Sequence, residues 1–182
     1  MVADELIKTI DTVFAGVDRP ETSLRQFLLT SEYGLTRDIT DDEWVHAGKG
    51  RVDTKWQDIP DFEIEECNCL LAHMQAEEFQ YYLPAYMRYS VKHYQKSIWE
   101  SDIIGSTVFS LSPISNDSDL KKYKVSPLSL FNYSVSQFSL LTKEHKKVIV
   151  EFLEFVARLD DHVQSPHAVK ALEQYWSKNV GT

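Results

Sequence analysis

The residues of this chain that could hold a metal ion are two cysteines and a few histidines and aspartates. Cys67, Cys69 and His73 lie in one short stretch, and Cys69 and His73 would share one side of a helix because they are four residues apart. A zinc site needs three or four protein ligands at regular spacing. Neither this stretch nor the range 160–162 with His167 has that spacing. We therefore predict no bound metal and no cofactor.

Covalent catalysis would need a nucleophile paired with a base. Cys67 or Cys69 could pair with His73 or His93, but no motif of a cysteine hydrolase surrounds them. The sequence Ile-Gly-Ser at 104–106 lacks the second glycine of a serine hydrolase elbow, and no glycine-rich phosphate loop occurs. Paired acids elsewhere are adjacent in sequence, so they do not face each other on a helix. We predict that the protein is not an enzyme.

Five of the nine tyrosines lie in the stretch 77–95, EEFQYYLPAYMRYSVKHYQ, which has a helical pattern. Pro84 lacks an N–H group and crowds the carbonyl four residues earlier, so we expect this helix to kink or to restart there. Residues at helical spacing define one face that is expected to point into the core. They are Phe79, Leu83, Tyr86, Met87, Ser90 and Tyr94.

A second stripe of the same helix holds Tyr82 and Tyr89, with Arg88 nearby. One interpretation is that these rings are buried and that their hydroxyl groups form hydrogen bonds inside the domain. Another is that the stripe is exposed and binds a protein, because tyrosine and arginine give large contacts with a polar end. A third interpretation places a ligand pocket at the proline bend. Its polar lining would consist of Tyr82, Tyr86, Arg88 and His93.

The charge of the chain points to a class of partner. Acidic residues number 28 and basic residues 19, which gives a net charge of −9. This charge repels nucleic acid and anionic lipid, and it speeds association with a basic partner. We therefore expect no binding to nucleic acid or membrane, and a protein partner with a basic surface. The acids expected to meet that surface include Asp41, Asp42, Glu63 and Glu66.

Helical periodicity accounts for most of the chain. Thr40 and Glu43 form a capping-box pattern, which is specific for the start of a helix. The serine-rich region 106–139 is the exception, because its short alternation of apolar and polar residues allows a small β-hairpin. We predict a mainly α, single compact domain over residues 1–182, with about six or seven helices and an irregular insertion near 106–139.

Other helix boundaries follow from the same rules. Ser23 and Thr142 are expected to cap helices, and Ser165 with the following proline should open the last one. We expect a helix over 61–74, with Glu63 and its neighbouring glutamates facing water, and a turn before the tyrosine-rich helix.

The N-terminal residues contain acids and no continuous apolar run, so we expect no signal peptide and no transmembrane span. Cys67 and Cys69 are two residues apart and would point in different directions on a helix, which disfavours a disulfide between them. We therefore expect a cytoplasmic protein with reduced thiols.

Several segments resemble an uncharacterised family of mostly α-helical bacterial proteins known as a domain of unknown function. The matching segments are Trp56-Gln57-Asp58-Ile59-Pro60, then Phe79-Gln80-Tyr81-Tyr82-Leu83-Pro84-Ala85-Tyr86-Met87, then an FLEF helix and an Ala-Leu-x-x-Tyr-Trp helix. The similarity spans about Lys55 to Trp176. It implies a bacterial origin and a helical fold, and it brings no catalytic residue, cofactor or substrate.

Three functions are compatible with these observations. The first is a non-enzymatic protein-binding role, such as an immunity protein that neutralises a basic toxin by covering its surface, since small acidic proteins of this sort are often found beside toxins. The second is a small-ligand binder or enzyme with a pocket at the proline bend. The third is a structural homo-oligomer, which light scattering would reveal.

Overall fold

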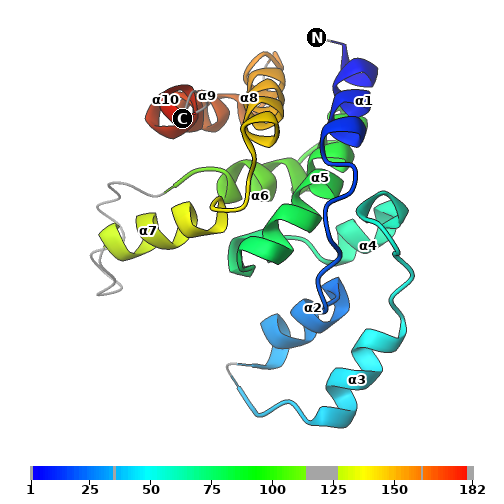
Figure 1. Cartoon of the computed structure of the whole chain (residues 1–182). Helices are drawn as coiled ribbons and strands as arrows, with labels where there is room; N and C mark the ends of the chain where they lie inside the picture. The colour runs from blue at the N-terminus through cyan, green and yellow to red at the C-terminus, as the bar shows by residue number, and fades with distance from the viewer. Residues whose placement is uncertain (1, 35, 114–126, 161, 180–182) are drawn as a thin grey trace.

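The computed structural model describes residues 2–34, 36–113, 127–160 and 162–179 (Figure 1). The α-helices of these ranges are α1 (Ala3–Val13), α2 (Leu24–Tyr33), α3 (Asp41–Lys49), α4 (Asp61–Glu66), α5 (Ala76–Lys92), α6 (Ile103–Ser110), α7 (Pro127–Gln137), α8 (Lys143–Ala157), α9 (Ser165–Ala171) and α10 (Ser177–Asn179). Two 3₁₀ helices, η1 (Trp56–Asp58) and η2 (Leu70–His73), and a π-helical segment, η4 (Leu172–Trp176), complete them. The predicted mainly α fold is confirmed, with more and shorter helices than expected.

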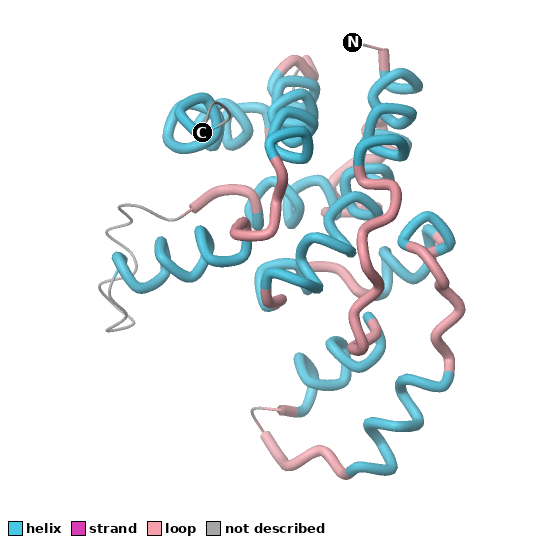
Figure 2. Tube along the Cα trace, in the orientation of Figure 1, coloured by secondary structure: helices cyan, strands magenta, loops and turns pink. Residues whose placement is uncertain are grey.

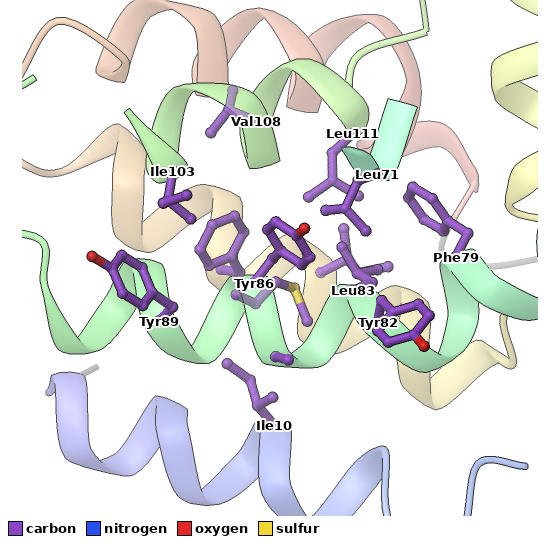
Figure 3. Packing of buried hydrophobic residues seen from close by; sticks show 14 of the residues in the cluster. Ile10, Leu71, Phe79, Tyr82, Leu83, Tyr86, Tyr89, Ile103, Val108 and Leu111 are labelled. Carbon is purple, nitrogen blue, oxygen red and sulfur yellow. The ribbon is translucent and has the colours of Figure 1, made fainter. Parts of the chain in front are cut away.

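Helix α5 is the centre of the fold. Eleven of its 17 residues are buried, because α1, α4, α6 and α7 all pack against it. Figure 3 shows Ile10 of α1 on one side of α5 and Ile103 and Val108 of α6 on the opposite side. A helix that is covered on several sides can bury residues around most of its circumference. The helix also continues through Pro84, so the chain does not restart at this proline.

The helix starts predicted from capping residues are confirmed at three places. The Ser23 hydroxyl accepts a hydrogen bond from the backbone N–H of Gln26, and the side chain of Gln26 accepts one from the backbone N–H of Ser23. The same exchange occurs between Thr40 and Glu43 at the start of α3. Thr142 caps α8. These motifs form locally, which explains why the sequence alone reveals them.

The β-hairpin allowed by the serine-rich region is wrong for the described residues, which contain no strand (Figure 2). Residues 103–110 and 127–137 form α6 and α7, while 114–126 lie outside the described ranges. Serines in these helices donate hydrogen bonds to backbone carbonyls one turn earlier. Ser110 bonds to Ser106 and Ser134 bonds to Leu130. These hydrogen bonds accommodate serine inside a helix, so the alternation of apolar and polar residues does not indicate a β-strand here.

The helix predicted over 61–74 is interrupted. Helix α4 ends at Glu66, and Cys69 then adopts a left-handed backbone conformation with φ of 66°. The chain continues as η2 and turns before α5, as predicted. The interruption changes which side chains face inward. Glu63 is buried at 5% exposure, whereas it was expected to face water.

The last helix begins at Ser165, the residue that was predicted to cap it. Gln164 occupies the capping position, and the Ser165 hydroxyl instead donates to the carbonyls of Val156 and Leu159 at the end of α8. One cluster of buried side chains runs from Leu6 in α1 to Trp176 in η4. None of the helices in the described ranges has the length and apolar character needed to cross a bilayer.

Candidate functional site

The tyrosines of α5 are interior residues. Tyr82, Tyr86 and Tyr89 are each at most 1% exposed, as is Tyr81. Their hydroxyl groups donate to partners inside the protein: Tyr81 to Asp53, Tyr82 to the Thr22 carbonyl, Tyr86 to the Cys67 carbonyl, and Tyr89 to Glu65. The buried interpretation is confirmed. Tyr82 and Tyr89 therefore do not form an exposed binding stripe, because the α1–α2 connection, at Thr22, and α4, at Glu65, meet their hydroxyl groups.

Arg88 and His93 are also used within the fold. The Arg88 guanidinium donates to the carbonyls of Gln57 and Ile59, both at 3.0 Å, and lies 5.2 Å from the ring centre of Trp56. His93 contacts the Asp61 carboxylate at 2.8 Å. These contacts attach the segment around η1 to the central helix.

Tyr82 and Tyr86, which were expected to line a ligand pocket at Pro84, are packed in the interior. Two cavities of the described structure are lined by other residues, and none of Tyr82, Tyr86, Arg88 and His93 contributes to either. The physical reason is the central position of α5. Its tyrosine rings fill the space beside the proline, and their hydroxyl groups already have hydrogen-bond acceptors.

A buried ion pair beside α5 was missed by the sequence reasoning. Arg51 and Asp53 have side-chain exposures of 7% and 4% and meet at 2.8 Å. Burial raises the pKa of the Asp53 carboxyl, but its hydrogen bonds with Arg51 and Tyr81 outweigh burial and hold this pKa below the ordinary value. Arg51 also donates to the carbonyl of Pro20 at 2.6 Å. The segment around Arg51 looks like an ordinary polar loop, and only the tertiary contacts show that it is interior.

Glu63 is the one predicted partner-binding acid that the fold removes from the surface. Its carboxylate lies 3.9 Å from Arg25 Nε, too far for a hydrogen bond, while Arg25 makes its closer ion pair with Glu66. Burial raises the pKa of Glu63, Arg25 offsets this in part, and nearby Asp53 raises it again. Glu63 therefore has the properties of a destabilising buried acid.

We expect Glu63→Gln to stabilise the protein at neutral pH by about 1 kcal/mol. A group with a raised folded-state pKa contributes stability below its unfolded pKa and loses that contribution as pH rises through the folded pKa. The gain should therefore disappear below about pH 4, where the acid is protonated in both states. Urea unfolding at several pH values measures it, with exposed Glu173→Gln as the control. A loss of stability at neutral pH would show instead that Glu63 and Arg25 form a productive pair.

Helix α3 presents two of the other predicted acids, Asp41 and Asp42, at one end of the molecule, packed against α2 (Figure 1). None of its residues is buried. Asp41 and Asp42 are exposed in its first turn, and Trp44 and Val45 follow with exposures of 37% and 53%. Residues three or four positions apart share a helix face, so Asp41 lies beside both apolar side chains. We call these four residues the α3 face.

The acidic residues on and near the α3 face differ in whether they already form an ion pair within the protein. Glu43 is engaged by Arg37, whose hydrogen bonds, with those of Thr40, lower the pKa of Glu43 to about 2. Asp41 and Asp42 form no ion pair within the described residues. Glu66 is exposed but is paired with Arg25 on α2. The α3 face therefore combines two unpaired negative charges with apolar area.

A cavity of about 670 Å³ lies elsewhere, between α6, η2 and the helix formed by α9 and η4. The sequence predicts no site there. It places Cys69 and His73 in one candidate metal set and His167 in another, and all three residues line this cavity. Among the described residues, however, no group of three histidines, cysteines or acids is arranged to hold a metal ion.

The fold and these surfaces define a mainly α-helical acidic protein built around one buried, tyrosine-rich helix. Residues 2–180 match a family of unknown function, DUF6714, and the chain belongs to this family. The predicted resemblance to an uncharacterised domain family is thus confirmed, and the match extends nearly to both ends of the chain. Comparison with curated proteins and comparison with solved structures both find no match.

Proposed function

We propose that this protein is a non-enzymatic, cytoplasmic protein-binding protein whose α3 face covers a basic surface of its partner. The observation that carries the proposal is the exposure of Asp41 and Asp42 beside Trp44 on a helix that buries none of its residues. Tryptophan is enriched among the residues that dominate binding energy, and unpaired acids steer a basic partner into place. An immunity protein that blocks a basic toxin is the form of this function that the charge of −9 favours.

The mode of binding proposed is occlusion. Trp44 and Val45 would enter an apolar depression of the partner, and the two aspartates would meet its lysines or arginines at the rim of the contact. Glu63 has no part in this interface because it is buried, and Glu66 has none because it already pairs with Arg25. The buried tyrosines of α5 support the fold and do not reach the partner.

The experiment is co-purification of the tagged protein from its host, followed by affinity measurement with the recovered partner. We expect Asp41→Asn/Asp42→Asn to slow association by about tenfold at low salt, and Trp44→Ala to weaken binding by about 2 kcal/mol. Removal of the charges should act mainly on the association rate, whereas removal of the indole should act mainly on dissociation.

The matched control is Glu144→Gln/Glu173→Gln, which changes the net charge equally at exposed positions away from α3. This control should leave most of the association rate unchanged. The proposal fails if no stoichiometric basic partner is recovered, or if the control variant weakens binding as much as the α3 variants do.

A further inference from the structure

The cavity between α6, η2 and the C-terminal helix has the size of a small-molecule site. Its volume is about 670 Å³, within the range of roughly 300 to 1,000 Å³ that is usual for ligand pockets. Residues from separate elements converge on it. They include His73 of η2, Ser106 of α6, His167 of α9 and Gln174 of η4. No residue of the α3 face takes part, so this site is independent of the proposed protein interface.

The wall formed by α6 is built from hydrogen-bond acceptors. The hydroxyl groups of Ser106 and Ser110 donate to the carbonyls of Ile103 and Ser106, at 3.1 Å and 2.8 Å. Their protons are therefore committed to the backbone, and their oxygens can accept from a ligand, although Ser106 also forms a hydrogen bond with the Cys69 thiol. Asp102 adds a carboxylate at the start of the same helix. This wall suits a ligand group that carries N–H protons.

The residues that the C-terminal helix contributes to the cavity supply donors. They are the Lys170 ammonium group, the His167 ring, and the side-chain amides of Gln164 and Gln174. Gln174 belongs to the π-helical segment η4, in which Trp176 is fully buried. Short π-helical segments are frequent at functional sites, because they change the direction of side chains within a helix. These donors suit a carboxylate.

Gly105 allows α6 and the start of α9 to approach each other. A Cβ atom at this position would collide with the Asp102 carboxylate and would lie 2.6 Å from the Gln164 amide nitrogen. The absence of a side chain thus lets an acceptor of α6 and an amide at the start of α9 share one region of the cavity. Neither Asp102 nor Lys170 has an ion-pair partner in the described part of the chain.

We propose that this cavity binds a small zwitterion of the amino-acid or short-peptide class. The ammonium group of the ligand lies toward Asp102 and the serine oxygens, and its carboxylate lies toward Lys170. An apolar side chain of the ligand packs against Phe109, which is 56% exposed and lines the cavity. The volume accommodates a dipeptide more fully than a single amino acid.

Alkylation of the Cys69 thiol gives a readout of ligand binding that does not depend on any enzymatic activity. Cys69 is exposed at the cavity, whereas Cys67 is fully buried. Burial raises the pKa of the Cys69 thiol and the charge of Asp102 raises it further, so alkylation is slow enough to follow by mass spectrometry. A ligand in the cavity should shield Cys69 from iodoacetamide. Cys67 serves as an internal control for unfolding.

The probe is the zwitterionic dipeptide alanyl-phenylalanine, compared with its N-acetylated and its C-amidated forms. We expect the dipeptide to slow Cys69 alkylation by about fivefold at saturation, and each modified form to bind about tenfold more weakly, which corresponds to about 1.4 kcal/mol per lost charge. Equal protection by all three compounds, or protection by none, overturns the proposal.

Single substitutions assign each charge to its end of the ligand. Lys170→Met should abolish the preference for a free carboxylate over the amide, and Asp102→Asn should abolish the preference for a free amine over the acetylated form. Both residues are exposed, so the fold should be retained, which circular dichroism verifies. Lys178→Met, on α10 and outside the cavity lining, is the matched control. The proposal fails if this control changes the preferences as much as Lys170→Met does.

Discussion

Asp53→Asn should destabilise the protein by about 3–5 kcal/mol, the usual cost of leaving a buried charge without its partner. Arg51 is almost completely buried, and Asp53 is the carboxylate that compensates its charge. The Asp53 carboxylate accepts hydrogen bonds from Arg51 Nε at 2.9 Å and from the Tyr81 hydroxyl at 2.7 Å. Asparagine keeps the size of the side chain but removes the charge, so the loss reports the electrostatic role.

The effect of this ion pair should also depend on pH. The folded-state pKa of Asp53 lies below its ordinary value, so the stability it contributes is present above the ordinary pKa of about 4. That contribution is lost as pH falls through the lowered pKa. The wild-type protein and Asp53→Asn should therefore converge in stability under strongly acidic conditions.

Urea unfolding followed by circular dichroism measures the difference. Glu154→Gln is the control, because Glu154 and Arg158 form an exposed pair at positions i and i+4 whose loss should cost less than about 0.5 kcal/mol. A double variant, Arg51→Leu with Asp53→Leu, should be less destabilised than the sum of its single variants. Equal effects of Asp53→Asn and Glu154→Gln would contradict the role of the buried pair.

Trp176→Ala should lower stability by a similar amount, about 3–5 kcal/mol. The indole is fully buried in the π-helical segment, and its ring centre lies 4.9 Å from that of Phe138. Its Nε1–H donates to the carbonyl of Leu111 at 2.7 Å, which connects the C-terminal helix to the end of α6. Alanine leaves both a cavity and an unpaired carbonyl, and it weakens the attachment of one wall of the ligand cavity.

The chain supplies a matched control for this substitution. Trp99 is 91% exposed, so Trp99→Ala should change the free energy of unfolding by less than about 0.5 kcal/mol. Thermal and urea unfolding of the two variants give the comparison. Equal losses in the free energy of unfolding for Trp176→Ala and Trp99→Ala would contradict the packing of the C-terminal helix on α6 described above.

The two proposed sites use different parts of the fold. The α3 face lies at the end of the molecule formed by α2 and α3 (Figure 1). The cavity proposed to bind a ligand is lined by residues of α6, η2 and the α9–η4 helix. Their tests are correspondingly separate. Asp41 variants should leave Cys69 alkylation unchanged, and Lys170 variants should leave association with a basic protein unchanged.

The sequence by itself determined the features that depend on near neighbours along the chain. Ser23, Thr40 and Thr142 start helices because a capping side chain bonds to a backbone group within three residues. The buried face of α5 through Phe79, Leu83 and Tyr86 follows from a spacing that is fixed by helix geometry. The family resemblance rests on the same local segments.

Only the tertiary structure decided which polar side chains are interior. Tyr82, Tyr89 and Glu63 occupy positions that an isolated helix would leave exposed, and segments distant in sequence cover them in the fold. The cavity could not be predicted for the same reason. Asp102 and Lys170 are 68 residues apart in the sequence, and they line one cavity only because α6 and α9 pack together. Local spacing sets the side of a helix on which a residue lies, but the neighbouring elements determine whether that side meets water.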